Sequence, residues 1–112
     1  MNIRNILAVT PNRVMGTIIK RHILAELSDA HVLSINSTAE ALQELEHRCY
    51  DIVLCSKQMQ GFDGLELHDR MRQTELNCRT SFLLLTSSRD PDNLQEIRDA
   101  GVEHVQFVPC SQ

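Results

Sequence analysis

Short apolar segments alternate with amphipathic segments along the whole chain, and this alternation limits the possible folds more than any other feature. Five segments rich in Ile, Val, Leu and Phe have the length and continuity of strands that are buried on both faces of a sheet. Because a longer segment separates each pair, crossovers rather than hairpins join the strands, which predicts an α/β fold with a parallel sheet. The predicted strands are 6–9, 31–35, 52–56, 81–86 and 104–108.

Four helices are predicted between these strands, and residues that favour helix termini mark their ends. Asn12 can cap the first helix, and Ser37 with Glu40 forms a capping box at the start of the second. Pro91 can open the fourth helix, and Gly101 stands where a helix end favours glycine. The predicted helices span 12–27, 37–48, 65–73 and 91–100.

The first predicted helix has an apolar stripe of the kind that packs on a sheet. The same helix carries a cluster of basic residues, whereas the region of the fourth helix is acidic. Such charges either keep two solvated surfaces soluble or form a polar interface for a partner. The residues of the apolar stripe are Val14, Ile18, Ile19, Ile23 and Leu27.

The composition is that of one soluble globular domain, which we assign to residues 1–112. The chain is 42% hydrophobic and 23% charged, with a net charge of -4. This acidic balance and the small number of aromatic residues argue against nucleic-acid binding. The longest purely apolar run, 82–85, is far shorter than the roughly 20 residues of a membrane-spanning helix. We therefore expect a cytoplasmic domain without direct membrane contact, whose parent protein can still be anchored in the inner membrane.

The cysteines and histidines favour structural roles. The four cysteines are widely spaced, include no Cys-x-x-Cys pair and occur without a secretory signal, so neither a disulfide nor a zinc site is predicted. Three histidines fall on predicted helices, as a phosphotransfer histidine would, but five predicted strands do not match a helical phosphotransfer bundle. We expect each of them at the surface or at its boundary. They are His22, His47 and His68.

An ordered set of landmarks runs through the sequence, centred on segment 50–67, which reads YDIVLCSKQMQGFDGLEL. With these landmarks, the chain resembles a response-regulator receiver domain over residues 6–109. The resemblance implies a flavodoxin-like (CheY-like) three-layer sandwich with strand order 2-1-3-4-5. The landmarks are Met59, Gly61, Asp63, Gly64, Thr86, Ala100, Gly101 and Pro109.

Receivers normally end in a fifth helix, which packs on the same side of the sheet as the first. The sequence stops at Gln112, shortly after Pro109, so this helix is expected to be missing or truncated. Part of the sheet and of the first helix would then lack their usual cover. An uncovered apolar surface of this kind tends to become an interface.

The resemblance also implies a phosphorylation site at the carboxyl ends of the strands, and most of its chemical groups differ here. Receivers place a phosphoacceptor Asp after the third strand, where this chain has Ser56. Thr10 and Pro11 replace an acidic pair that helps to hold Mg²⁺, and Val108 replaces a Lys. We therefore predict a pseudo-receiver that is not an enzyme and holds no metal or other cofactor. The retained positions are Thr86 and Pro109.

Without phosphate chemistry, the favoured function is that of a non-catalytic interaction module in a two-component phosphorelay. The module would dock a response regulator, or an adjacent histidine kinase or phosphotransfer domain, within a larger multidomain signalling protein. Its short C-terminal end is similar to the α/β/loop modules of Rcs-type phosphotransfer proteins and hybrid sensor kinases. The predicted docking surface is the first-helix side, with candidate residues Arg13, Ile19, Lys20, Arg21 and Ile23.

Two other functions stay open on the sequence alone. The domain could be a structural spacer or a dimerisation module, because an exposed apolar face on the first helix would favour self-association. It could also bind a small polar ligand at the strand ends. There, Thr10, Ser56 and Thr86 would present three hydroxyl groups to the ligand.

Overall fold

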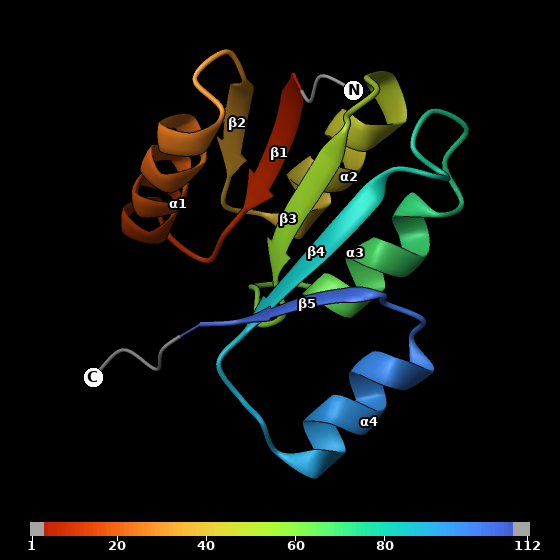
Figure 1. Cartoon of the computed structure of the whole chain (residues 1–112). Coiled ribbons are helices and arrows are strands. Elements are labelled where there is room, and N and C mark those ends of the chain that lie inside the picture. The colour runs from red at the N-terminus through yellow and green to blue at the C-terminus, as the bar shows by residue number, and fades with distance from the viewer. Residues whose placement is uncertain (1–3, 109–112) are drawn as a thin grey trace.

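The computed structural model describes residues 4–108 and contains a five-stranded sheet of order β2-β1-β3-β4-β5 (Figure 1). All neighbouring strands run parallel. The predicted flavodoxin-like (CheY-like) fold and its strand order are therefore confirmed. The strands are β1 (Asn5–Val9), β2 (His31–Ile35), β3 (Ile52–Ser56), β4 (Ser81–Thr86) and β5 (His104–Phe107).

Four helices lie within the described residues, one in each connection between consecutive strands, as the alternation in the sequence predicts. Two predicted caps are confirmed. The side chain of Asn12 accepts a hydrogen bond from the Met15 amide at 2.9 Å, and the Ser37 hydroxyl accepts one from the Glu40 amide at 3.4 Å. The helices are α1 (Arg13–Glu26), α2 (Thr38–His47), α3 (Gly64–Met71) and α4 (Pro91–Asp99).

Two element ends differ slightly from the prediction. α3 ends at Met71 rather than near residue 73, because the chain tightens there into hydrogen bonds between residues three apart. One of these bonds joins the Thr74 amide to the Met71 carbonyl at 3.0 Å. β5 ends at Phe107, although the next residue, Val108, still donates its amide hydrogen to the Thr86 carbonyl at 2.9 Å.

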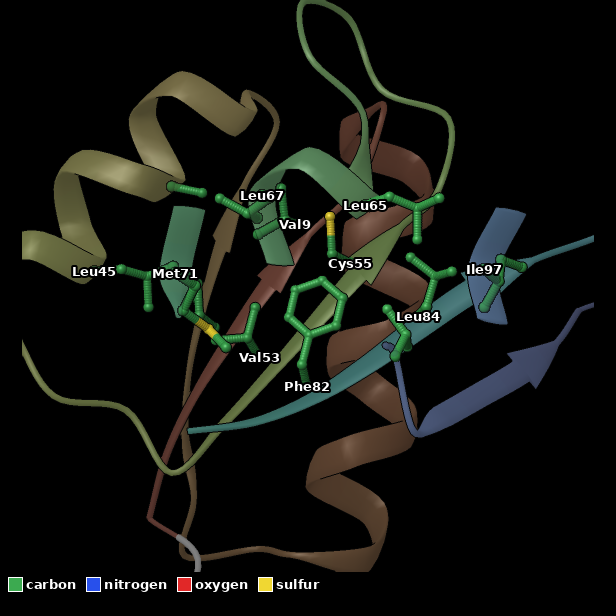
Figure 2. Close-up of a cluster of buried hydrophobic side chains, with 13 residues drawn as sticks. Val9, Leu45, Val53, Cys55, Leu65, Leu67, Met71, Phe82, Leu84 and Ile97 are labelled. Carbon is green, nitrogen blue, oxygen red and sulfur yellow. The ribbon is translucent and has the colours of Figure 1, made fainter. Parts of the chain in front are cut away.

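The main core lies on one face of the sheet, which we call the closed face because α2, α3 and α4 cover it (Figure 2). Every second residue of β1, β3 and β4 points to this face, as the two-residue period of a strand requires. The strand residues of this core are Leu7, Val9, Val53, Cys55, Phe82 and Leu84. The helix residues labelled against them in Figure 2 are Leu45, Leu65, Leu67, Met71 and Ile97.

The opposite face, which we call the open face, carries α1 alone among the helices within residues 4–108 (Figure 1). Ile6 and Ala8 of β1 are buried on this side, but Leu54 of β3 and Leu83 of β4 are only half-buried. The open face is thus less completely covered than the closed face.

Part of the predicted apolar stripe of α1 faces solvent, which corrects the expectation from the sequence. Val14 is 70% exposed, Ile18 is 49% exposed, and Leu27, just after the helix, is 38% exposed. The reason is Gly16, the buried residue of α1, where an added Cβ would lie 2.5 Å from the Ser34 Oγ of β2. Val14 and Ile18 are each two residues from Gly16, about 200° around the helix, so they point away from the sheet.

A buried amide side chain, which local sequence patterns do not predict, holds together the amino edge of the sheet. Asn77 is fully buried. Its Nδ2 donates hydrogen bonds to the carbonyls of Leu45 and Arg48, and its Oδ1 accepts from the Tyr50 amide and the Thr80 hydroxyl. These bonds offset the cost of burying the amide and tie the end of α2 to the segments before β3 and β4.

Candidate functional site

The carboxyl ends of the strands meet at one edge of the sheet, and most residues predicted to mark a phosphorylation site lie there. Pro11, Ser56, Thr86 and Val108 line one pocket of about 170 Å³. Ligands of open parallel sheets bind at this kind of position. Pro109 lies outside the described residues. The other lining residues are Met15, Lys57, Gln58, Leu85, Ser87, Ser88 and Asn93.

Thr10 does not line this pocket, although the sequence placed its hydroxyl there. The side chain is buried, and its hydroxyl donates a hydrogen bond to the Asn12 carbonyl at 3.1 Å. It also accepts one from Asn36 Nδ2 at 3.4 Å. Thr10 therefore fixes the connection between β1 and α1, and the predicted set of three hydroxyls facing a ligand reduces to two.

Those two hydroxyls, of Ser56 and Thr86, differ in how firmly they are held. Among the described residues, Ser56 Oγ has one polar contact, a weak one to Met15 Sδ at 3.8 Å. Thr86 Oγ1 accepts hydrogen bonds from the Ser88 amide at 3.3 Å and from Asn93 Nδ2 at 3.4 Å. Thr86 therefore links the end of β4 to the start of α4, whereas no basic side chain within residues 4–108 forms a hydrogen bond with the Ser56 hydroxyl that would activate it.

Lys57 is a residue of this site that the sequence analysis missed. Its side chain is only 14% exposed, and its Nζ lies 3.1 Å from Glu96 Oε1 of α4. The ion pair joins the end of β3 to α4 across the end of β4. No sequence signal connects residues 57 and 96, because their proximity depends on how α4 packs beside the sheet.

The pocket does not fit the divalent cation that a phosphorylation site of this kind implies. Its lining residues contribute hydroxyls, amides and the cationic Lys57 but no carboxylate. Mg²⁺ prefers carboxylate and other oxygen ligands in near-octahedral geometry, and a neighbouring ammonium group repels it. Within residues 4–108, no group of three or more His, Cys, Asp or Glu side chains is placed to hold a metal ion.

The two aspartates nearest to Ser56 in the sequence accept hydrogen bonds outside the pocket. Asp51 accepts hydrogen bonds from the amides of Arg4 and Asn5, at 3.0 and 2.9 Å, at the amino edge of the sheet. These bonds lower the pKa of its carboxyl below the ordinary value. Asp63 caps α3 by accepting a hydrogen bond from the Glu66 amide at 2.9 Å. Both carboxylates therefore have structural roles.

Gly64, which follows Asp63, brings the start of α3 close to the pocket. Its amide donates a hydrogen bond to the Lys57 carbonyl at 2.9 Å. An added Cβ would lie 2.5 Å from the Ser56 carbonyl oxygen and 3.1 Å from the Lys57 Cα. Only glycine permits this approach, so the position of α3 and that of the Ser56–Lys57 segment depend on each other.

The cysteine beside Ser56 is no substitute nucleophile. Cys55 points into the closed face (Figure 2), and burial raises the pKa of its thiol, which therefore stays protonated at neutral pH. Cys49 and Cys78 are exposed free thiols away from the pocket, and Cys110 lies outside the described residues.

The α1 surface separates the predicted docking residues into two groups. Arg13, Lys20 and Arg21 are exposed, whereas Ile19 and Ile23 are half-buried against the sheet. The apolar residues that α1 offers to solvent are instead Val14 and Ile18, which share its outward face with Arg21. Lys20 lies toward β2, beside a groove that it lines with Leu24 and Leu33. We define the α1 patch as Arg13, Val14, Ile18 and Arg21.

The strand order of the parallel sheet is that of a CheY-like fold, in which ligands bind at the carboxyl edge. The chain matches the family model of the response regulator receiver domain over residues 6–109. It therefore belongs to this family of two-component signalling, as the resemblance in its sequence implied. A search of curated protein sequences found no match.

Solved structures agree with this assignment at the level of the fold. The receiver domain of sensor histidine kinase PA1611 from Pseudomonas aeruginosa is 23% identical, with a TM-score of 0.83, over 96% of this chain and 87% of that one. Chemotaxis protein CheY4 of Vibrio cholerae is 21% identical, with a TM-score of 0.82, over 97% and 89%. The receiver domain of a histidine kinase from Syntrophus aciditrophicus is 22% identical, with a TM-score of 0.83, over 96% and 80%.

Proposed function

We propose that this receiver domain performs no phosphotransfer itself and acts as a docking module in two-component signalling. The observation that carries the proposal is the pocket at the strand ends, whose lining includes no carboxylate. A receiver stores phosphate as an acyl phosphate, which forms only on a carboxylate. Ser56 offers a neutral hydroxyl instead, and a weak contact to Met15 does not activate it. On this reading the domain is a pseudo-receiver and not an enzyme.

The α1 patch is the surface that we assign to partner binding. It combines two exposed apolar side chains, Val14 and Ile18, with the guanidinium groups of Arg13 and Arg21. Apolar contacts supply affinity and charges orient an incoming partner, so such a surface suits a protein with an acidic rim around an apolar centre. The partner would be a response regulator, or an adjacent histidine kinase or phosphotransfer domain.

The parent protein that suits this role is a larger signalling protein that concentrates its partner near a reactive site elsewhere. Two of the similar structures are receiver domains of histidine kinases, so the fold is compatible with a kinase-type parent. A hybrid sensor kinase or an Rcs-type phosphotransfer protein, anchored in the inner membrane with this domain on the cytoplasmic side, fits the proposal. Within residues 4–108, no helix has the length and apolar character needed to cross a membrane.

The absence of phosphotransfer is tested by exposing the protein to acetyl phosphate and Mg²⁺ and measuring its intact mass. An ordinary receiver domain treated in parallel serves as the positive control. We expect the control to gain one phosphoryl group and this domain to gain none. A phosphorylated product that is labile to hydroxylamine, as acyl phosphates are, would refute the non-catalytic assignment.

Docking is tested by NMR, with labelled protein titrated with response regulators and phosphotransfer domains of the same organism. We expect localised amide shifts on α1 for one partner, and loss of these shifts in Val14→Asp and Ile18→Asp. Leu76→Asp is the matched control, because Leu76 is 44% exposed in the segment between α3 and β4. Shifts that avoid α1 would refute the assigned surface. An unchanged spectrum with every candidate would refute docking to these classes.

Self-association is the second candidate function, and the exposure of Val14 and Ile18 favours it. Sedimentation over a range of protein concentrations distinguishes self-association from docking of a different protein. A monomer–dimer equilibrium that Ile18→Asp abolishes would make this surface a dimerisation site. If the protein is monomeric at all concentrations, docking of a different protein is favoured.

A further inference from the structure

His68 is a buried titratable group that the pocket and the α1 patch do not use. The sequence placed it at the surface or at its boundary, but in α3 it is only 6% exposed, which corrects that expectation. Its ring meets the ring of Phe82 of β4 edge to face, with centroids 5.0 Å apart. The contact is part of the packing of α3 on the closed face.

One ring nitrogen of His68 is left without a partner. Nδ1 is buried and has no hydrogen-bonding group within reach in the described part of the chain. A neutral imidazole tolerates this when Nδ1 carries the lone pair, at the cost of one unsatisfied acceptor. A protonated imidazole carries N–H groups on both nitrogens, so it would bury a charged donor that lacks an acceptor. The site therefore accommodates neutral histidine far better than the cation.

The charges around the ring only partly offset this preference. Arg72, which caps the C-terminal end of α3, repels a proton on His68, whereas Asp69 of α3 and Glu103, just before β5, attract one. β4 faces the ring with the apolar Phe82. Burial is the largest influence, and together with Arg72 it lowers the pKa of His68 below the ordinary value for histidine.

We propose that His68 makes the packing of α3 on the sheet sensitive to protonation, so that mild acid loosens α3 and the segment leading to it from Ser56. The connection to that segment is Gly64, which opens α3 and touches the backbone of Ser56 and Lys57. Because these contacts are close, a shift of α3 also displaces the wall of the pocket. The inference does not depend on the proposed docking function.

The direction of the pH effect follows from proton uptake. The unfolded chain, with an ordinary histidine pKa, binds a proton more readily than the folded chain. The fold is therefore unaffected well above the ordinary pKa of about 6.5 and loses stability as the pH falls below it. The folded-to-unfolded ratio decreases by up to about tenfold per pH unit until the pKa of the folded state is reached.

The test compares urea unfolding of the wild type, His68→Leu and His22→Leu between about pH 7.5 and about pH 5.5, across the histidine range. His22 is exposed on α1, so it controls for the loss of any histidine. We expect the wild type and His22→Leu to lose stability in parallel as the pH falls, and His68→Leu to lose up to about tenfold less per unit. The same pH dependence in all three would overturn the inference.

An NMR titration of the wild type covers the case in which His68→Leu does not fold. We expect the ring protons of His68 to titrate below the ordinary histidine pKa of about 6.5. Amide hydrogen exchange in α3, corrected for the intrinsic effect of pH, should accelerate in acid before that of β4. Titration of His68 at or above about pH 6.5, with unchanged protection of α3, would overturn the inference.

Discussion

The two faces of the sheet differ in how fully their apolar residues are covered. On the closed face, Leu84 and its neighbours in the core are essentially inaccessible to solvent under three helices. On the open face, Leu54 and Leu83 are half-buried, and α1 turns Val14 outward. The comparison indicates that, within residues 4–108, the apolar residues of the sheet are buried more completely on the closed face than on the open face.

The edge strand β5 shows the same difference within four residues. His104 and Gln106 are exposed and lie beside Leu83 and Leu85, on the open face. Val105 alternates with them, is half-buried and packs against the core of the closed face. The open face is therefore apolar in its centre and polar along β5.

The largest expected effect comes from two adjacent leucines of β4 that point to opposite faces. Leu84→Ala should lower the free energy of unfolding by about 2–5 kcal/mol, because it leaves a cavity in the closed face. Leu83→Ala should cost less, roughly 1–2 kcal/mol, because Leu83 is only half-buried. Urea unfolding measures both. Equal losses of stability in the two variants would mean that the open face is covered in solution as fully as the closed face.

Two glycines provide a second matched pair. In Gly64→Ala the new Cβ would meet the Ser56 carbonyl oxygen at 2.5 Å, and the backbone there cannot rotate away. In Gly16→Ala the nearest atom is the Ser34 hydroxyl oxygen, also at 2.5 Å, which a change of side-chain rotamer can remove. We expect Gly64→Ala to cost about 1–3 kcal/mol and Gly16→Ala distinctly less. A larger cost at Gly16 in thermal unfolding would show that α1 is held more rigidly than the open face suggests.

The titration of the Tyr50 phenol reports on a hydrogen bond at the border of the closed face. Burial, followed by its 2.7 Å hydrogen bond to Glu44, raises the pKa of this phenol to about 12. Its contribution to stability is therefore fully present below pH 10 and is lost as the pH rises toward 12. The chain has one Tyr and no Trp, so ultraviolet absorbance reports this phenol alone. Glu44→Gln should shift its titration to lower pH, and an unshifted titration would contradict the contact.

The smallest expected effect concerns the α1 patch. Val14→Ser should change the free energy of unfolding by no more than about 0.5 kcal/mol, because the side chain is 70% exposed. It should also reduce the binding of a hydrophobic dye, if the α1 patch is the apolar surface accessible in solution. A destabilisation comparable to that of Leu84→Ala would show that Val14 is buried by contacts in solution.

Much of the fold follows from local patterns. Continuous apolar runs gave all five strands, and Asn12 and Ser37 act as the helix caps that their spacing predicts. The strand order came from the resemblance to receivers, because hydrophobic periodicity carries no information about which strands pair. Pro11, Ser56, Thr86 and Val108 line one pocket, since the carboxyl ends of parallel strands meet at one edge.

The orientation of α1 was predicted less well. Its apolar residues cover a broad arc of the helix, and hydropathy does not reveal which part of that arc meets the sheet. Gly16 sets the orientation of α1, because it allows the helix to approach β2 most closely at this residue. Since glycine contributes almost nothing to a hydrophobic pattern, the sequence does not reveal this orientation. The predicted partner residues Ile19 and Ile23 consequently lie half-buried, and Val14 and Ile18 are the exposed ones.

The sequence by itself determined the alternation of strands and helices, the helix caps and the residue types at the strand ends, because each depends on neighbours along the chain. The tertiary structure decided the Lys57–Glu96 ion pair, the hydrogen bonds of Asn77 and the burial of His68. Each of these joins residues that are distant in sequence, so it exists only after the helices have packed on the sheet. Local propensity specifies elements, whereas packing determines which polar groups end up buried and which partners they find.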